Sequence, residues 1–214
     1  MHVTGKIWNA SHPRTIGLNA LTANILCRSH NSGLSPLDAS GGEATRALGE
    51  FIGSQARRRR VRTTGNFIET HGVDGALFER LLLKTLINFV VAKDGGEVWA
   101  GSQAHDDPPL NLVQVAFGLA RLLFPAGLYM NPGARSTIRS DRDGLECTTL
   151  VDAEMTVVGA KYLFRGFPFL LWIDEQTAPH GSIGVNLKDV LHRPKSIKGQ
   201  VGDVVTSELV FRWP

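Results

Sequence analysis

The sequence predicts an α+β fold in which N-terminal helices pack against a C-terminal antiparallel sheet. The chain has 214 residues, of which 43% are hydrophobic, so it is long enough to bury a sizeable core. Before residue 125, apolar residues recur at helical spacing in several segments. From Cys147 onwards, β-branched and apolar residues instead alternate with a period of two. This order of patterns is typical of an α+β arrangement.

The first helix is predicted over residues 36–52. Ser35-Pro36-Leu37-Asp38 forms a capping box, in which Ser35 can accept a hydrogen bond from the amide of Asp38 and Pro36 fits the first turn. Gly41 and Gly42 weaken this helix, because each costs about 1 kcal/mol relative to alanine.

Two further helices are predicted, over residues 73–92 and 110–124. In the second helix Asp74 lies in the first turn, where the helix dipole favours an anion, and Asp94-Gly95-Gly96 ends the pattern. The third follows Asp107-Pro108-Pro109 and stops at Pro125. Because both helices are apolar on nearly all sides, we expect the sheet or other helices to cover them.

The remaining segments predict antiparallel strands joined by turns. The strands are expected at Cys147–Val158, Lys161–Ile173 and Val204–Trp213, with turns at Asp143-Gly144, Gly159 and Gly166. We divide the chain into a basic segment, residues 1–72, and a helical core with its sheet, residues 73–214. We expect the two to form one compact unit.

Charge and cysteine content narrow the class of protein. Residues 1–72 hold 9 basic and 4 acidic residues, whereas residues 73–214 hold 14 and 16, so the net charge of +3 has its origin in the N-terminal part. Two cysteines are too few for a disulfide framework, and the longest apolar stretch, residues 77–92, is interrupted by polar residues. We expect a cytoplasmic protein without a membrane partner.

Motifs of nucleotide hydrolases, common dehydrogenases and zincin proteases are absent from the sequence.

A possible metal pair lies just before the first helix. Cys27 and His30 have the C-x-x-H spacing with which a zinc knuckle points a thiolate and an imidazole at one ion. Zinc needs further ligands, and no second pair with such spacing is present. The alternative is a buried thiol beside a histidine that braces a turn.

Two segments carry a resemblance to a known family. The run ILCRSHNSGLSPLD, residues 25–38, and the run GALFERLLLKTL, residues 75–86, resemble segments of bacterial proteins related to HNH endonucleases. The resemblance implies that Cys27 and His30 are zinc ligands and that Asn31 is a polar neighbour of a nuclease site, which makes His30 and Asn31 candidate catalytic residues.

In that group, an upstream segment provides a C-x-x-C pair and an acidic-His dipeptide, and neither occurs in this sequence. We therefore expect either that an N-terminal half is missing or that the site has degenerated. The resemblance implies a nucleic-acid-binding module that is catalytically incomplete. Any enzymatic activity would be that of a metal-dependent HNH-like nuclease.

A run of arginines is the strongest charge feature. Five arginines lie within six positions: Arg57, Arg58, Arg59, Arg60 and Arg62. Arginine binds phosphate with two parallel hydrogen bonds and is always charged, so this run is a candidate nucleic-acid contact. The alternative is a solvated strand, or a helix end whose carbonyl groups favour cations.

Glu79 is the third candidate residue. At about 100° per residue it lies in the middle of the apolar stripe of the second helix, so it needs a partner from another element. A buried salt bridge or hydrogen bonds to backbone amides would provide one. The functional alternative is a general acid or base.

A different class of function competes with nucleic-acid binding. This alternative is a protein-interaction or self-associating scaffold of a defence or toxin type, in which residues 110–124 remain partly uncovered and form an interface. A third alternative is an enzyme that acts on a small molecule with Glu79 and a histidine at its centre.

Overall fold

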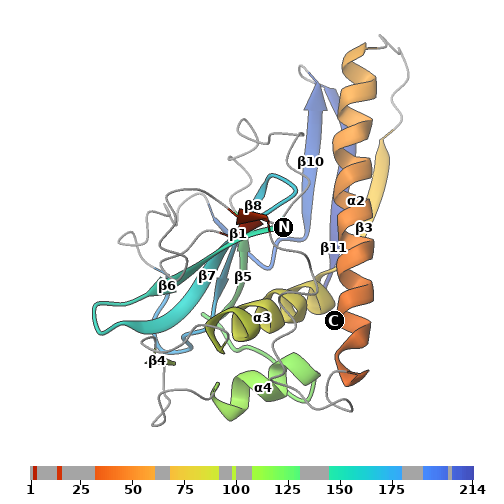
Figure 1. Ribbon diagram of the computed structural model, residues 1–214. Coiled ribbons are helices and arrows are strands. Elements are labelled where there is room, and N and C mark those ends of the chain that lie inside the picture. Colours follow the sequence, from red (N-terminus) through yellow and green to blue (C-terminus); the bar gives the residue numbers. More distant parts are fainter. Residues whose placement is uncertain are drawn as a thin grey trace.

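The computed structural model describes residues 2–3, 14–15, 32–60, 68–91, 98–99, 108–130, 145–179, 190–201 and 204–214. These residues confirm the α+β class (Figure 1). The helices are α2 (Ser35–Arg60), α3 (Gly75–Val91) and α4 (Leu110–Phe117). The strands are β1 (His2–Val3), β2 (Arg14–Thr15), β3 (Glu69–Asp74), β4 (Val98–Trp99), β5 (Gly127–Met130), β6 (Leu145–Val151), β7 (Thr156–Phe164), β8 (Phe167–Trp172), β9 (Leu191–His192), β10 (Ser196–Val201) and β11 (Val204–Arg212).

The described strands form a pair and two larger sheets. The pair is β1-β2, the three-stranded sheet has the order β10-β11-β3, and the six-stranded sheet has the order β4-β7-β8-β5-β9 with β6 on β7. Most pairings are antiparallel, as predicted. The pairings of β11 with β3 and of β4 with β7 are parallel. The parallel partner of β11 comes from a segment that the sequence analysis assigned partly to a helix.

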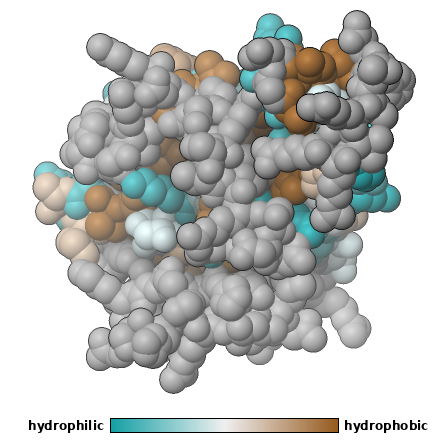
Figure 2. All heavy atoms as spheres, turned by 90° about the horizontal axis from the view of Figure 1, so that it is seen from above, coloured by the Kyte–Doolittle hydropathy of each residue, from teal (hydrophilic) through white to brown (hydrophobic). Residues whose placement is uncertain are grey.

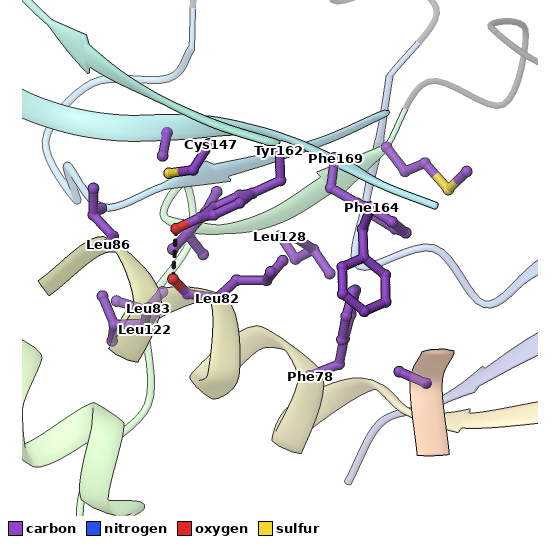
Figure 3. Packing of buried hydrophobic residues seen from close by; sticks show 14 of the residues in the cluster. Phe78, Leu82, Leu83, Leu86, Leu122, Leu128, Cys147, Tyr162, Phe164 and Phe169 are labelled. Atoms are coloured by element: carbon purple, nitrogen blue, oxygen red, sulfur yellow. Dashed lines mark hydrogen bonds between the residues drawn. The ribbon is translucent and has the colours of Figure 1, made fainter. Parts of the chain in front are cut away.

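The main hydrophobic core lies between α3 and the six-stranded sheet (Figure 3). Phe78, Leu82 and Leu86 of α3 are almost fully buried. On the sheet side, the Tyr162 hydroxyl donates a hydrogen bond to the Leu82 carbonyl at 2.6 Å. Helix α2 packs along the three-stranded sheet and against α3, so one continuous core joins all three helices to the strands (Figure 1).

Helix α2 is longer than predicted. It continues to Arg60, eight residues beyond the predicted end at Ile52. Alanine, glutamine and arginine in the added turns favour a helix, and contacts with β3 hold this part in place. The glycines do not interrupt the helix: a side chain at Gly41 would lie 2.9 Å from a Leu81 methyl group, so this glycine permits close packing of α2 on α3.

The beginning of α2 also differs from the capping-box prediction. The first turn is made by a backbone hydrogen bond from Leu37 to the Leu34 carbonyl at 3.0 Å. The Asp38 carboxylate accepts a hydrogen bond from Lys84 Nζ of α3 at 2.7 Å. Asp38 therefore ties two helices together, where the sequence analysis gave it a role within one helix.

The predicted helix over residues 73–92 divides into β3 and α3. The helix begins at Gly75, and the Asp74 carboxylate accepts a hydrogen bond from the Leu77 amide at 2.9 Å. Asp74 thus precedes the first turn and caps it. Residues 69–74 extend as a strand because all six pair with residues 207–212 of β11.

Helix α4 is shorter than predicted and is only partly covered. It ends at Phe117 because Gly118 adopts a left-handed conformation with φ of 78° and forms the C-cap. Pro109 precedes its first turn without a side-chain cap. Leu112 and Val115 are buried, but Leu110 is 72% exposed, so the expectation that the apolar face would be fully covered is wrong for α4.

The turns of the six-stranded sheet differ from the prediction in two ways. The predicted strand Cys147–Val158 divides into β6 and β7, with a turn at residues 152–155. Gly166 lies in a turn as predicted, with φ of 80°. Gly159 instead lies inside β7, opposite Trp172 of β8, where a side chain would collide with the Leu171 carbonyl. The turn before β7 is made by the Asp152 carboxylate, which accepts a hydrogen bond from the Thr156 amide at 2.8 Å.

Among the helices that the structure describes, none has the length and apolar character needed to cross a membrane.

Candidate functional site

The structure places only part of the predicted site. Cys27, His30 and Asn31 lie outside the described residues, as does Arg62. The backbone of Arg57–Arg60 forms the C-terminal end of α2. Within the described residues, no group of three or more His, Cys, Asp and Glu side chains is arranged to hold a metal ion. The described part therefore tests neither the zinc prediction nor the role of Asn31.

The end of α2 carries a polar cluster shared with β3, which we call the α2–β3 cluster. Its members are Glu50, Ser54 and Arg57 of α2 with Glu69 and His71 of β3. Positions 50, 54 and 57 are spaced by four and three residues, so they lie on one face of the helix. Figure 2 views the molecule from the end at which α2 terminates in Figure 1.

Ser54 is the centre of this cluster. It is fully buried, and its hydroxyl contacts the Glu69 carboxylate and the Glu50 carbonyl, the latter at 2.9 Å. Arg57 Nη2 donates to Ser54 Oγ at 3.1 Å and to Glu69 Oε2 at 2.9 Å. The hydrogen bond from Ser54, followed by that from Arg57, holds the pKa of Glu69 below its ordinary value. Glu69 is thus an ionised partner of Arg57.

His71 completes the cluster. Its Nε2 lies 3.2 Å from Ser54 Oγ, and its Nδ1 lies 3.3 Å from the Glu50 carboxylate. The ring therefore bridges the Ser54 hydroxyl and the Glu50 carboxylate, and it links β3 to α2 at two points.

The order of Glu50, His71 and Ser54 matches that of an acid, a base and a nucleophile. A nucleophile must reach its substrate, and Ser54 has no exposed surface. Its oxygen also accepts a hydrogen bond from Arg57, which lowers its reactivity toward an electrophile. The cluster is therefore a polar junction that fastens α2 to β3.

A second buried polar group lies under the same part of α2. The Ser207 hydroxyl of β11 is buried and has no hydrogen-bond partner among the described residues. A side chain at Gly199 of β10 would collide with Ser207 Oγ and with the Gln55 amide. Glycine at this position lets the helix approach the strands closely, and this approach brings β3 within reach of Ser54.

The run of arginines is partly neutralised at its beginning. The Arg57 side chain is 65% exposed and forms an ion pair with Glu69, whose side chain is 29% exposed. The Arg57 hydrogen bonds go to Ser54 and Glu69, so they decide neither for a nucleic-acid contact nor for a cation at the helix end. The structure does not describe the side chains of Arg58, Arg59 and Arg60. The run as a whole therefore stays a candidate nucleic-acid contact.

Glu79 is buried and has partners from other elements, as its position in the apolar stripe of α3 predicted. It is 5% exposed, and its carboxylate accepts hydrogen bonds from Arg193 Nη2 at 2.9 Å and Nε at 3.1 Å. The Leu128 amide donates to Oε2 at 2.8 Å. The structural prediction, a salt bridge or amide contact from another element, is confirmed. The carboxylate accepts hydrogen bonds from three donor atoms. It therefore holds both β5 and the segment after β9 against α3.

His192 lies beside this salt bridge. Its ring packs against Tyr129 and Phe124, with centroid distances of 4.8 Å and 5.4 Å, and its Nε2 lies 3.1 Å from the Ala126 carbonyl. Burial lowers the pKa of His192 below its ordinary value. The ring is therefore neutral at physiological pH and behaves as part of an aromatic cluster.

The segment after α4 exposes several large apolar side chains. Leu119 and Phe124 are 80% and 74% exposed, and Leu110, Leu123 and Leu191 are exposed as well. Phe124 also contacts the His192 ring of β9. Leu191 precedes His192 in that strand, so its side chain points to the opposite face. We call Leu119, Leu123 and Phe124 the α4-loop surface.

Sequence reasoning missed Ser54, Glu69, His71 and Arg193 as partners. A helix extended to Arg60 would have placed Glu50, Ser54 and Arg57 on one face, and this spacing was the available signal. Glu69 and His71 alternate with exposed residues in β3, a pattern of period two that the predicted helix obscured. No sequence signal connects Arg193 to Glu79, which precedes it by 114 residues.

Comparisons with protein-family models, with curated proteins and with solved structures gave no match.

Proposed function

We propose that this protein is a nucleic-acid-binding module related to HNH endonucleases, and that it contacts nucleic acid through the basic end of α2. The observation that supports this most directly is the position of Arg57–Arg60 in the final turn of a 26-residue helix. The Arg57 side chain, the described member of the run, is 65% exposed. The resemblance of residues 25–38 and 75–86 to that group supports the same proposal.

The binding would be electrostatic and independent of base sequence. A guanidinium group donates two parallel hydrogen bonds to phosphate and stays charged at every physiological pH. Neutralised phosphates release counterions, so affinity falls steeply as salt increases. Because Arg57 is held by the α2–β3 cluster, the run begins from a fixed point on the fold.

The proposal includes no catalytic step. Glu79 is buried and accepts three hydrogen bonds, from Arg193 and the Leu128 amide, and Ser54 is buried as well. A general base for water attack on phosphate has no described candidate. Cys27 and His30 are proposed as zinc ligands of a structural kind, and a protein with two cysteines in all is suited to the reducing cytoplasm.

The test is a binding titration by fluorescence anisotropy with labelled duplex and single-stranded DNA. We expect binding at about 50 mM salt that weakens by on the order of 100-fold at 200 mM. The triple variant Arg58→Gln/Arg60→Gln/Arg62→Gln should bind more weakly than the wild type on both DNAs. Unchanged affinity in the triple variant would refute the proposal. Metal analysis of wild type and Cys27→Ser tests the zinc assignment separately.

A second candidate function has its own support. The α4-loop surface exposes three large apolar residues within six positions of the chain, and exposed apolar area is a feature of association sites. Self-association through this surface is compatible with nucleic-acid binding, because α4 and the end of α2 lie at opposite ends of the molecule (Figure 1). A dimer would also present two basic helix ends to one nucleic acid.

A further inference from the structure

We propose that Glu69 is an internal competitor for phosphate at Arg57, and so lowers the affinity of the basic end of α2 for nucleic acid. This inference rests on the proposed function. It concerns one contact, in which Arg57 Nη2 lies 2.9 Å from Glu69 Oε2. A carboxylate and a phosphate oxygen accept from the same guanidinium donors, so one must yield when the other binds.

The two partners of this ion pair are held differently. The Glu69 side chain is 29% exposed and is fixed by Ser54, which is itself anchored to the Glu50 carbonyl. The Arg57 side chain is 65% exposed. The Arg57 guanidinium is therefore the more accessible of the two groups, so solvent or a phosphate can reach it while the carboxylate stays in place.

The direction of the Arg57 side chain supports the same inference. A side chain at Gly53 would lie 3.4 Å from Arg57 Nη1, so the guanidinium is folded back along α2 toward Ser54 and Glu69. An exposed ion pair is only weakly stabilising, because water competes for both charges. A phosphate can then displace Glu69, and the cost of displacement appears as a lower affinity.

Glu69 is ionised over the physiological range. Hydrogen bonds from Ser54 and Arg57 hold its pKa below the ordinary value, and His71 adds a smaller favourable interaction. The competitor is thus present whenever the protein meets nucleic acid at neutral pH.

The experiment compares charge-matched variants by fluorescence anisotropy on one labelled DNA duplex. Glu69→Gln should bind about 3-fold to 10-fold more tightly than the wild type, and its plot of log affinity against log salt should steepen by about 0.9, the value for one more phosphate contact. Glu154→Gln removes an equal charge in the exposed turn between β6 and β7, and it should change affinity by less than about 2-fold.

Two further variants separate competition from charge and from misfolding. Glu69→Asp keeps the negative charge but withdraws it from Arg57 by one methylene, so it should also tighten binding. In an Arg57→Gln background, Glu69→Gln should have no larger effect than Glu154→Gln. Circular dichroism confirms that each variant is folded before the titration.

The outcomes distinguish this inference from the function on which it rests. A wild type that binds, with Glu69→Gln and Glu69→Asp no tighter than Glu154→Gln, overturns the competition and leaves the proposed function standing. A wild type and a Glu69→Gln variant that both fail to bind at about 50 mM salt overturn the proposed function, and the competition with it.

Discussion

At the scale of single residues, Glu79 shows how a charge can lie in an apolar core. The carboxylate is buried by the apolar stripe of α3 but receives two hydrogen bonds from Arg193 and one from the Leu128 amide. Removing one partner of such a pair leaves the other charge uncompensated, which costs more than the pair itself contributes. Glu79 is therefore expected to matter for stability.

Glu79→Gln should lower the free energy of unfolding by about 3 kcal/mol, the lower end of the range for buried pairs, because Arg193 retains some access to water. Urea denaturation followed by circular dichroism measures this change. Glu154→Gln, at an exposed turn, serves as the control and should stay within about 0.5 kcal/mol of the wild type. A Glu79→Gln variant as stable as this control would show that the salt bridge does not hold the fold.

His192 predicts a dependence of stability on pH. Its pKa in the folded protein is lowered by burial, so the unfolded chain takes up the proton first as pH falls below about 6.5. The neutral ring therefore contributes to the free energy of unfolding above that pH. This contribution is lost as pH falls toward and through the lowered pKa.

Urea denaturation of wild type and His192→Gln at pH 7.5 and pH 5.5 tests this dependence. The wild type should lose more stability between the two pH values than the variant does. Equal losses would assign the pH dependence to other groups.

At the scale of elements, the junction between α2 and β3 depends on Ser54. Ser54→Ala removes the hydrogen bond to an ionised carboxylate and leaves Arg57 and His71 with one partner fewer, so we expect a loss of about 2 kcal/mol in unfolding free energy. Ser40→Ala is the matched control, because Ser40 is a buried serine of the same helix whose hydroxyl, within the described part of the chain, donates to the Leu37 carbonyl.

The control should lose less than about 1 kcal/mol. Hydrogen exchange offers a second measurement, since the amides at the end of α2 should exchange faster in Ser54→Ala and not in Ser40→Ala. A loss in Ser54→Ala no greater than in Ser40→Ala would contradict a junction role for the α2–β3 cluster.

Some helices and strands were predictable from the sequence and others were not. The apolar patterns of α3, β7 and β8 are strong because most residues of each element are buried or half-buried. The end of α2 and the existence of β3 were not predictable in this way. Their local signals are weaker, and both depend on tertiary pairing, of α2 with β3 and of β3 with β11, which local patterns do not specify.

The candidate site was predictable to a similar extent. Glu79 was identified from its own helix, because a carboxylate within an apolar stripe is visible in the sequence. Its partner, Arg193, lies in a loop far along the chain and adopts a positive φ of 43°, which no pattern indicates. The arginine run is identified from the sequence. The ion pair of Arg57 with Glu69 depends on tertiary structure and could not be predicted.

At the scale of the whole molecule, the α4-loop surface predicts self-association. Burial of Leu119, Leu123 and Phe124 against a second copy would remove apolar area from water, which favours a dimer. The variant Leu123→Ser/Phe124→Ser should elute as a monomer in size-exclusion chromatography with light scattering, at concentrations where the wild type is a dimer.

Val204→Ser is the control for this experiment, because Val204 is 54% exposed but lies at the start of β11, away from α4 (Figure 1). It should leave the wild-type mass unchanged. A wild type that is monomeric at the highest attainable concentration would remove the support for the scaffold function.

The central claim for the whole molecule is that the basic end of α2 binds phosphate. The most direct test is the salt dependence of DNA affinity for wild type, for Arg58→Gln/Arg60→Gln/Arg62→Gln and for the control Arg46→Gln/Arg121→Gln/Lys195→Gln, which removes the same charge from other exposed positions. If the run binds phosphate, the slope of log affinity against log salt should be shallower by about 3 in the first triple variant and nearly unchanged in the control. Equal slopes in the two triple variants would contradict the claim.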